Sequence, residues 1–576
     1  MEQKPKKLNF GTSGLRDTVE NMTDLECYIN TRGFLKYLMQ IKEFSKGDTV
    51  IIAGDHRQST PRIKKAVAIA VKALGGNPDD QGRIPSPALV YYAMTILAPG
   101  IMVTGSHIPE DRNGIKFSKK SGEVLKSDEK PILNCVEEER KIVDKERKKT
   151  EIFDAKGMFL KKFSDKHSDI LRDIDFKGKA REMYIKRYVS VFKNIVPEGN
   201  KRIFLYQHSS VSRDILKEVF VQLGFDVVSG EKEISVEIPD NDKLITQKAD
   251  LRSEKFIPVD TESVSALTMA VFKKMLNENK IDIGITTDGD GDRPLIVYRK
   301  YINGTPSTEI EYITGDILGV LTVQALWAFG SKIECAAVPV SANDAIEIGL
   351  YKLGVKIVRT KIGSPYVVAQ MDQFLKENRK NNVVSWEANG GFLTANDLVI
   401  DNRILKALPS RDALLPLLSV LFLAFKNKKS IFDLLEALPK RYTFADRKKD
   451  FPLEKSAYIL NRLSLEPKTI KEIVFDNSKA ILNHYDGHLS TDEQQKAFAI
   501  KEILEKVFTS KDGFSDVKKI NYIDGVRITF SNGEISHLRP SGNAPEFRNY
   551  AMADTPSRAK QIVELGIAKI IPELSL

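Results

Sequence analysis

The first clear pattern in the chain is an apolar run, then a polar loop, then an apolar helix. Thr49 to Ala53 has the composition of a buried strand, and the loop after it ends at Pro61. Proline is favoured at the first position of a helix, and Arg62 to Leu74 is rich in Ala, Val and Ile. This order of segments predicts half of a parallel α/β unit.

The same half-unit recurs twice. Ile203 to Tyr206 leads to the helix Arg213 to Leu223, and Cys335 to Val338 leads to the helix Asp344 to Leu353. Each copy later reaches a strand that ends in a loop of small polar residues. These strands end at Val103, Ile285 and Val384. Three α/β domains of one design explain the repeat, and we expect their loops to converge on one cleft because ligands bind at the carboxyl ends of such strands.

The periodicity changes after the charged, proline-bounded segment Pro439 to Pro452, which we interpret as a linker or hinge. Tyr522 to Ser536 alternates around the hairpin signal Asn532-Gly533, and Arg558 to Ile571 has a helical pattern. The predicted fold class is α/β, with three similar α/β domains of mixed sheets and a smaller C-terminal α+β domain around a central cleft. The expected domains are residues 1–180, 181–305, 306–438 and 439–576.

Composition narrows the class of protein. The 576 residues are 42% hydrophobic and 29% charged, which supplies several packed cores and argues against disorder. The formal charge of +10 comes from lysines spread along the chain. A nucleic-acid binder needs a basic stripe with interleaved aromatics, so we expect no nucleic-acid partner. A basic cleft for small phosphorylated substrates fits the charge better.

The cysteines and the apolar runs help to predict the cellular compartment of the protein. Cys27, Cys135 and Cys335 are far apart and imply neither a disulfide framework nor a metal site. The N-terminal residues lack the hydrophobic segment of a signal peptide. The longest apolar run, Leu414 to Phe425, is too short to span a bilayer and should form a buried helix. We therefore expect a cytoplasmic protein with no membrane partner, as a monomer or a dimer.

The segment Ile101 to Phe117, IMVTGSHIPEDRNGIKF, is the first that carries chemistry. It starts as a buried strand, and Pro109 then stiffens the loop that follows. Ser106 and His107 lie in that loop, and the Asn113-Gly114 turn signal returns Lys116 towards it. A hydroxyl, an imidazole and an ammonium group on one rigid loop suit a nucleophile that handles a dianionic group.

The strongest signal is the run Asp288-Gly-Asp290-Gly-Asp292-Arg293 after a predicted strand. The glycines let the backbone curl, so the three carboxylates can point at one site. Their mutual repulsion is resolved by a hard divalent cation. An EF-hand would need a Glu about twelve positions on and flanking helices, but Arg299 occupies that place and a strand precedes the loop. We therefore predict a magnesium site.

Other loops offer groups for a sugar phosphate. Thr12 and Arg16, in a glycine-rich loop, can bind phosphate. Glu387 and Asn389 are placed to bind vicinal sugar hydroxyls. The turn Thr360 to Pro365 is a weaker motif. The segment RPSGNAPE predicts an anion cradle, and its candidate residues are Arg539, Ser541, Gly542 and Asn543, with Arg548 nearby.

Four of these motifs, in this order, resemble those of the alpha-D-phosphohexomutases. They are TGSHIP with NGIK, DGDGDR, EANGG and RPSGNAPE, and the resemblance covers nearly the whole chain. The family has four domains, three alike and a smaller fourth. The resemblance implies an isomerase that interconverts hexose 6-phosphate and hexose 1-phosphate through a phosphoserine and a hexose 1,6-bisphosphate.

The resemblance also implies roles for individual residues. Ser106 would be the phosphorylated catalytic residue and a metal ligand beside Asp288, Asp290 and Asp292, which would hold Mg²⁺. Arg293 would contact the transferring phosphate, and His107 and Lys116 would assist proton transfer or position the hydroxyl. The expected substrate-binding residues are Thr12, Arg16, Gly363, Ser364, Glu387, Asn389, Arg539, Ser541, Gly542, Asn543 and Arg548.

The chain departs from the family pattern at three positions. Gly105 and Ile108 replace the Ala and Asn common in the serine loop, a change of packing rather than of chemistry. Asn389 stands where many bacterial members have Ser. Mannose is the expected sugar, and glucose, glucosamine and N-acetylglucosamine remain open. The alternatives in other classes are a phosphatase, which would use an Asp nucleophile, and a non-catalytic module that binds sugar phosphate or calcium.

Overall fold

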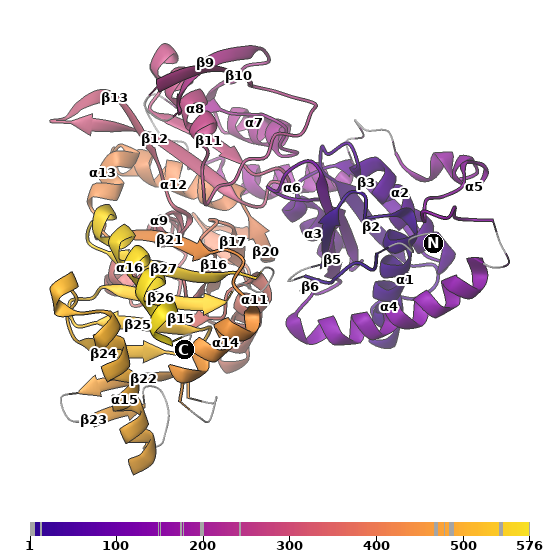
Figure 1. Ribbon diagram of the computed structural model, residues 1–576. Helices are drawn as coiled ribbons and strands as arrows, with labels where there is room; N and C mark the ends of the chain where they lie inside the picture. The colour runs from indigo at the N-terminus through magenta and orange to yellow at the C-terminus, as the bar shows by residue number, and fades with distance from the viewer. Residues whose placement is uncertain are drawn as a thin grey trace. The chain divides into compact units, whose positions relative to one another are not determined.

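The computed structural model describes most of the chain (Figure 1). The described residues are 6–11, 14–147, 149, 151–172, 176, 178–195, 201–240, 243–465, 470–476, 479–482, 489–540 and 545–574. They form two compact units. Unit 1 holds the described residues of Met1–Ala337, Gly354–Lys356 and Gly363–Leu435, and unit 2 those of Val338–Leu353, Ile357–Ile362 and Glu436–Leu576. The four-domain division stays a prediction.

The N-terminal sheet follows the predicted strand–loop–helix pattern. Its strands are β1 (Gly14–Thr18), β2 (Thr49–Gly54), β3 (Asn77–Arg83), β4 (Gly100–Val103), β5 (Arg112–Lys119) and β6 (Gly122–Glu123). The order is β1-β5-β4-β2-β3, with β6 beside β5, and β2 runs parallel to β3 and β4. The helices are α1 (Asp24–Gln40), α2 (Thr60–Ala73), α3 (Ser86–Thr95), α4 (Lys126–Arg147) and α5 (Lys161–Asp165). Pro61 lies in the first turn of α2, as predicted.

The second sheet repeats this plan. Its strands are β7 (Arg202–Leu205), β8 (Asp226–Val228), β11 (Ile283–Thr287), β12 (Pro294–Ile302) and β13 (Thr305–Tyr312), in the order β13-β12-β11-β7-β8. β7 runs parallel to β8 and β11. The hairpin β9 (Glu233–Asp240) and β10 (Lys243–Asp250) packs on α8 (Ala266–Asn279). The other helices are α6 (Lys179–Phe192) and α7 (Arg213–Gln222).

The third sheet has the order β15-β14-β16-β17-β20. Its strands are β14 (Cys335–Pro339), β15 (Lys356–Thr360), β16 (Val383–Trp386), β17 (Phe392–Thr394) and β20 (Leu408–Asp412), and β18 (Leu398–Ile400) pairs with β19 (Arg403–Leu405). The helices are α9 (Gly315–Ala328), α10 (Ala345–Leu350), α11 (Ser364–Glu377), α12 (Leu414–Lys426) and α13 (Ile431–Glu436). The predicted buried helix is α12, and no helix in the described part of the chain is long and apolar enough to cross a bilayer.

Unit 2 contains a seven-stranded sheet in the order β21-β27-β26-β25-β24-β22-β23. Its strands are β21 (Tyr442–Lys448), β22 (Glu472–Asp476), β23 (Lys479–Leu482), β24 (Val517–Asn521), β25 (Val526–Phe530), β26 (Ile535–Pro540) and β27 (Phe547–Ala553). The helices are α14 (Leu453–Arg462), α15 (Thr491–Val507) and α16 (Pro556–Leu574). The hairpin predicted at Asn532-Gly533 joins β25 to β26. The mixed α/β fold is confirmed.

The segment Pro439 to Pro452 is predicted to be a linker or hinge, but half of it forms a strand. It contains β21, which pairs with β27 at the edge of this sheet. β21 is largely exposed, so it lacks the alternating apolar residues that mark a half-buried strand.

A buried histidine makes the fold sensitive to acid. His208 is fully buried after β7, and its Nε2 lies 2.9 Å from the carbonyl oxygen of Thr287. Burial disfavours the charged imidazolium and lowers the pKa of His208 to about 4, although the Thr287 carbonyl opposes the shift. Because the unfolded chain binds this proton more readily, stability is full above pH 6.5 and falls as the pH drops towards 4.

We expect His208 to lower the free energy of unfolding by about 2 kcal/mol when the pH falls from 7.5 to 5. The measurement is the melting temperature of wild type and His208→Gln at both pH values. The variant should lose less stability on acidification than wild type does. Equal losses for the two proteins would show that other groups govern the acid sensitivity.

Candidate active site

Ser106 lies in the loop between β4 and β5 and is 1% exposed. Its φ is +56°, a left-handed conformation that costs a residue with a Cβ about 1 kcal/mol or more. The backbone N–H of Ser106 donates to Thr104 Oγ1 at 2.8 Å. Its hydroxyl donates to Asp288 Oδ2 at 2.6 Å, and His107 Nδ1 lies 3.3 Å from Ser106 Oγ. The loop thus presents the predicted nucleophile in a strained, defined position.

A buried arginine holds this loop. Arg57 follows β2, is fully buried, and donates to the carbonyl oxygens of Ser106 at 3.1 Å and Ile108 at 2.6 Å. It also reaches the carbonyls of Pro109 and Arg112. A Cβ on Gly105 would lie 2.5 Å from Arg57 Cζ, so a larger residue at this position would have to displace the guanidinium group. Arg57 was not predicted from the sequence. The only sequence signal for it is its position in the polar loop after the strand.

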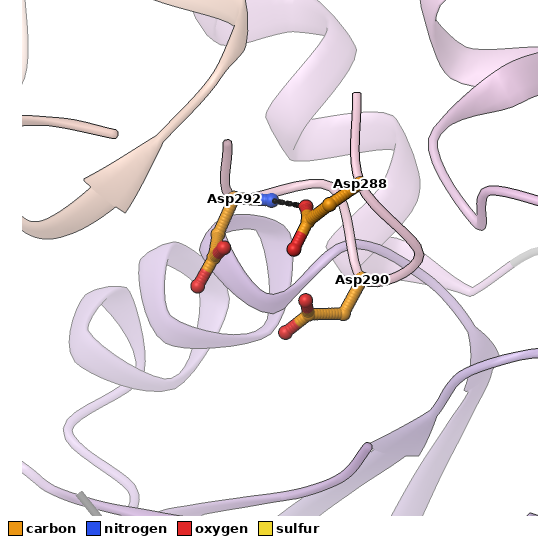
Figure 2. Close-up of side chains that lie close together, drawn as sticks. All are labelled: Asp288, Asp290 and Asp292. Carbon is orange, nitrogen blue, oxygen red and sulfur yellow. Dashed lines mark hydrogen bonds between the residues drawn. The ribbon is translucent and has the colours of Figure 1, made fainter. Parts of the chain in front are cut away.

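The three aspartates form one cluster after β11 (Figure 2). One carboxylate oxygen of each lies within 4.8 Å of the others, and all three residues are buried. Asp288 Oδ1 accepts the backbone N–H groups of Asp292 and Arg293, each at 3.2 Å. Gly291, with φ +72°, makes the turn between these residues. The loop therefore bends as the Asp-Gly spacing predicts.

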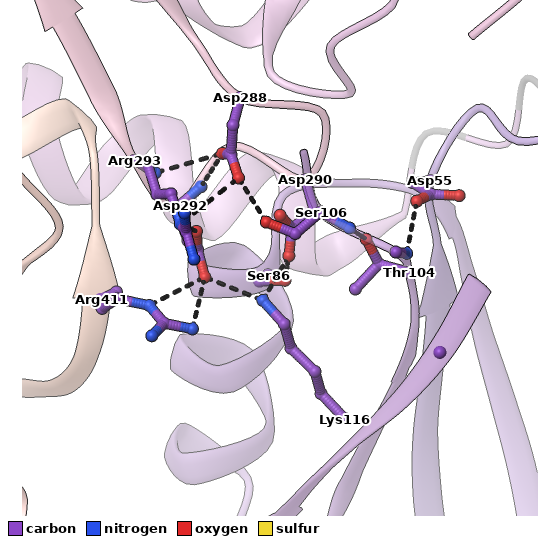
Figure 3. A network of polar contacts seen from close by, with 12 residues as sticks. Asp55, Ser86, Thr104, Ser106, Lys116, Asp288, Asp290, Asp292, Arg293 and Arg411 are labelled. Atoms are coloured by element: carbon purple, nitrogen blue, oxygen red, sulfur yellow. Dashed lines mark hydrogen bonds and ion pairs between the residues drawn. The ribbon is translucent and has the colours of Figure 1, made fainter. Parts of the chain in front are cut away.

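Cationic side chains surround the triad (Figure 3). Lys116 Nζ donates to Asp290 Oδ2 at 2.6 Å and to Asp292 Oδ2 at 2.8 Å. Burial lowers the pKa of Lys116, but the charges of Asp290 and Asp292 outweigh that effect and raise it, so the ammonium form is favoured. Burial, and then the charges of Asp290 and Asp292, hold the pKa of Asp288 well above its usual range.

Two oxygen atoms in this cluster fit a cation. Asp290 Oδ1 and Asp292 Oδ1 are buried and have no hydrogen-bond partner among the described residues. A buried carboxylate oxygen without a partner is costly, and a hard divalent ion is its natural ligand. Asp288 Oδ2 and the Ser106 hydroxyl lie together beside them. The donor set is all oxygen, as magnesium prefers.

The remaining predicted catalytic residues face the same cluster. Arg293 Nε lies 3.8 Å from Asp288 Oδ2 and 3.8 Å from Asp292 Oδ1. Burial, and then the charge of Arg293, lower the pKa of His107 to about 4, so its imidazole is neutral near pH 7. Residues Ser106, His107, Lys116, Arg293 and the triad are thus brought together within unit 1.

Arg411 on β20 connects the loop after β16, which holds Glu387, to the triad. Its Nε donates to Asp292 Oδ2 at 3.1 Å, and its NH1 donates to Glu387 Oε2 at 3.0 Å. Asn389 uses its Oδ1 within its own loop, where it accepts from Gly391 N at 2.9 Å. Arg411 was not predicted from the sequence, and neither was Ser86, which donates to Asp290 at 2.5 Å.

The other candidate residues lie in several places. Arg16 is exposed on β1. Gly363, with φ +124°, precedes α11, and Ser364 is buried and donates to Glu123 Oε2 at 2.7 Å. Arg539 and Arg548 lie on β26 and β27 of unit 2. The remaining four candidates, Thr12, Ser541, Gly542 and Asn543, lie outside the described residues.

Comparison with known proteins finds related sequences along the chain. Three domain models of the phosphoglucomutase/phosphomannomutase family match this chain. The model of alpha/beta/alpha domain I matches residues 7–142, that of alpha/beta/alpha domain III matches residues 314–442, and that of the C-terminal domain matches residues 489–565. A phosphomannomutase of Salmonella muenchen is 36% identical, with 98% of this chain and 96% of the relative covered. A phosphomannomutase of Sinorhizobium fredii is 31% identical, with 97% and 98% covered.

A solved structure shares the fold. It is a phosphoglucomutase/phosphomannomutase family protein from Burkholderia thailandensis, with a TM-score of 0.61 and 16% identity, over 98% of this chain and 96% of that one. The chain therefore belongs to the phosphoglucomutase/phosphomannomutase family, the alpha-D-phosphohexomutases. It is a hexose-phosphate mutase, an isomerase that transfers a phosphoryl group within its substrate.

We expect removal of the Arg411 side chain to lower kcat/KM strongly, although Arg411 lies on β20 and not in the loops that hold Ser106 and the triad. Arg411→Ala leaves Asp292 and Glu387 without the buried cation that they share, a loss of about 3 kcal/mol or about a hundredfold in kcat/KM. Arg411→Lys should recover part of the activity because it restores the charge without the planar fork. Steady-state kinetics with a hexose 1-phosphate measure both.

The matched control for this prediction is Lys406→Ala. Lys406 pairs with Asp397 on the surface, where both side chains are exposed. Its removal should change kcat/KM less than twofold, since exposed pairs contribute little. Equal kinetics for Arg411→Ala and Lys406→Ala would contradict the role given to Arg411.

Proposed function

We propose that the protein interconverts mannose 6-phosphate and mannose 1-phosphate through a phosphorylated Ser106 and a mannose 1,6-bisphosphate. The observation that carries the proposal concerns Ser106. Its backbone is held in a left-handed conformation, and its hydroxyl donates a hydrogen bond to Asp288 of the buried triad. The names of the two relatives with the highest reported identities support mannose as the sugar.

The reaction balances without an external reagent. A sugar hydroxyl attacks the phosphorus of phosphoserine, the bond to Ser106 Oγ breaks, and the proton of the sugar hydroxyl passes to a base and finally to Ser106 Oγ. The bisphosphate then turns round and returns its other phosphate to Ser106. Phosphate-monoester cleavage has a very high uncatalysed barrier, so positioning and charge must supply most of the rate.

The residues of unit 1 would divide this work. Arg293 and Lys116 place positive charge beside Ser106 and offset the charge that spreads over the transferring phosphoryl group. Neutral His107 can accept or donate a hydrogen bond at Ser106 Oγ. Glu387 would bind a sugar hydroxyl, and Arg411 fixes the orientation of its carboxylate.

The triad would hold Mg²⁺ through Asp288, Asp290 and Asp292, with a phosphoserine oxygen of Ser106 as a further ligand. The ion would supply a fixed positive charge next to the transferring phosphate. We further propose that Thr12, Arg16, Gly363 and Ser364 help to bind substrate, with Asn389 supporting the sugar loop. The non-reacting phosphate would bind the cradle of Arg539, Ser541, Gly542, Asn543 and Arg548. A cytoplasmic location fits this chemistry.

A coupled assay with mannose 1-phosphate, glucose 1-phosphate and N-acetylglucosamine 1-phosphate tests the choice of sugar. We expect the highest kcat/KM for mannose 1-phosphate, by about tenfold or more over glucose 1-phosphate, because the two sugars differ in one hydroxyl that the site must read. A higher value for N-acetylglucosamine 1-phosphate would assign the sugar loop EANGG to an amino sugar and overturn the mannose assignment.

A further inference from the structure

Three arginines of unit 2 form one row across neighbouring strands. Arg447 on β21 lies directly opposite Arg548 on β27, and Arg548 lies directly opposite Arg539 on β26. Residues directly opposite in antiparallel strands share one face of the sheet, with their Cβ atoms about 5 Å apart. We call Arg447, Arg548 and Arg539 the arginine row. Like charges in this relation repel, so the row needs an anion to balance it.

The carboxylates nearby balance the row incompletely. Glu546 serves two of the arginines: its Oε1 lies 3.2 Å from Arg447 Nε, and its Oε2 lies 2.9 Å from Arg548 NH2. Asp524 Oδ2 lies 3.6 Å from Arg539 NH2, a distance beyond a good hydrogen bond. Arg539 Nε is buried and has no partner among the described residues. Among the described residues, three guanidinium groups therefore share two carboxylates, and the buried Nε of Arg539 is left without a partner.

The row does not serve the hydrophobic core. Neighbouring positions on the same strands, Leu538 and Phe547, belong to the core of unit 2 and lie on the opposite face of the sheet. The side chains of Arg447 and Arg548 keep exposed fractions of 47% and 34%, so both can reach a solute. Their planar forks match the oxygen atoms of a phosphoryl group.

We propose that Arg447 is a third guanidinium of the phosphate cradle and binds the non-reacting phosphate of the hexose phosphate together with Arg539 and Arg548. This inference rests on the proposed function and extends its cradle to β21, a segment that the sequence argument treated as a linker. A phosphate dianion offers three acceptor oxygens and the negative charge that the row lacks. In its absence, Glu546 bridges Arg447 and Arg548.

Equilibrium binding to the full chain tests the inference. Ser106→Ala serves as the background because it prevents turnover, and mannose 6-phosphate is titrated by calorimetry. Arg447→Ala should raise the Kd about tenfold, as expected for the loss of one charged hydrogen-bonding group. Arg447→Lys should fall between the two because it keeps the charge and loses the fork. Inorganic phosphate is the second probe and should lose affinity in the same order.

Lys448→Ala is the matched control. Lys448 follows Arg447 on β21 but lies opposite Phe547, on the other face of the sheet, and its loss changes the net charge by the same amount. We expect its Kd to equal that of the background. Equal values for Arg447→Ala and Lys448→Ala would overturn the inference and show that Arg447 only protects the edge of the sheet.

Arg539→Ala separates this inference from the proposed function. A weaker Kd for Arg539→Ala with an unchanged Kd for Arg447→Ala would keep the proposed cradle and remove Arg447 from it. Unchanged Kd values for both variants would instead overturn the phosphate cradle itself. Weaker Kd values for both, with Lys448→Ala unchanged, support the inference.

Discussion

Ser106→Ala is expected to reduce mutase turnover by about ten-thousandfold or more, the scale on which the loss of a nucleophile acts in enzymes with covalent intermediates. The physical reason is that Ser86, the other hydroxyl that donates to a triad carboxylate among the described residues, is not placed to take over its role. Ser86 donates to Asp290, but it lies at the start of α3 and has no such strained turn. The measurements are kcat in a coupled assay and the intact mass after incubation with a hexose 1,6-bisphosphate.

Ser86→Ala is the control for this prediction. It removes a buried hydroxyl beside the same triad, so it should cost about tenfold in kcat and still accept phosphate on Ser106. Only Ser106→Ala should lose the added phosphate mass. If wild type never gains phosphate under these conditions, or if Ser106→Ala keeps more than a few per cent of the activity, the phosphoserine scheme is wrong.

The backbone at Ser106 provides a second readout of the same residue. Ser106→Gly and Ser106→Ala both lack the hydroxyl, but only glycine adopts a φ of +56° without strain. The glycine variant should therefore be more stable than the alanine variant by about 1 kcal/mol. Such a difference would show that the strain found at Ser106 is present in solution and is independent of catalysis.

The parts of the site that the sequence predicts are those that are contiguous in it. Ser106 with His107, and Asp288 with Asp290 and Asp292, carry their chemistry in local spacing, and the glycines between the aspartates dictate the turn. The three α/β repeats were likewise visible because their strands are buried and their helices apolar. For these features, the structure that the local sequence pattern favours is the one found in the fold.

The missed residues depend on long-range contacts. Arg411 binds Asp292 across 119 residues of chain, and Ser86 binds Asp290 across 204. No local pattern distinguishes an arginine that will pair with two buried carboxylates from one that is solvated. β21 was missed for the opposite reason: an exposed edge strand has no apolar alternation to reveal it.

Asp288→Asn is expected to abolish the response of the protein to magnesium without destabilising the metal-free fold. Burial and the charges of Asp290 and Asp292 raise the pKa of Asp288, so they shift this side chain towards its neutral form when no cation is bound. The amide reproduces that form. In a chelator, the melting temperature of the variant should therefore equal or exceed that of wild type.

With added Mg²⁺ the order should reverse. Wild type gains stability as RT ln(1 + [L]/Kd), whereas the variant gains none, and its kcat should fall by about a thousandfold because the charge that the ion supplies is worth several kcal/mol. Asp282→Asn is the control, since Asp282 lies before β11 and pairs with Arg299 away from the triad. It should keep the magnesium response.

The two melting measurements together decide what the triad is for. The three carboxylates lie within 4.8 Å of one another, and the charges of Asp290 and Asp292 disfavour the ionised form of Asp288 in the metal-free protein. A cluster retained for structure would therefore lose stability when one member is neutralised, whereas a cluster retained for a cation would not. If Asp288→Asn melts several degrees lower in chelator and Mg²⁺ stabilises neither the variant nor wild type, the triad is a structural network, and the positive charge at Ser106 must come from Lys116 and Arg293.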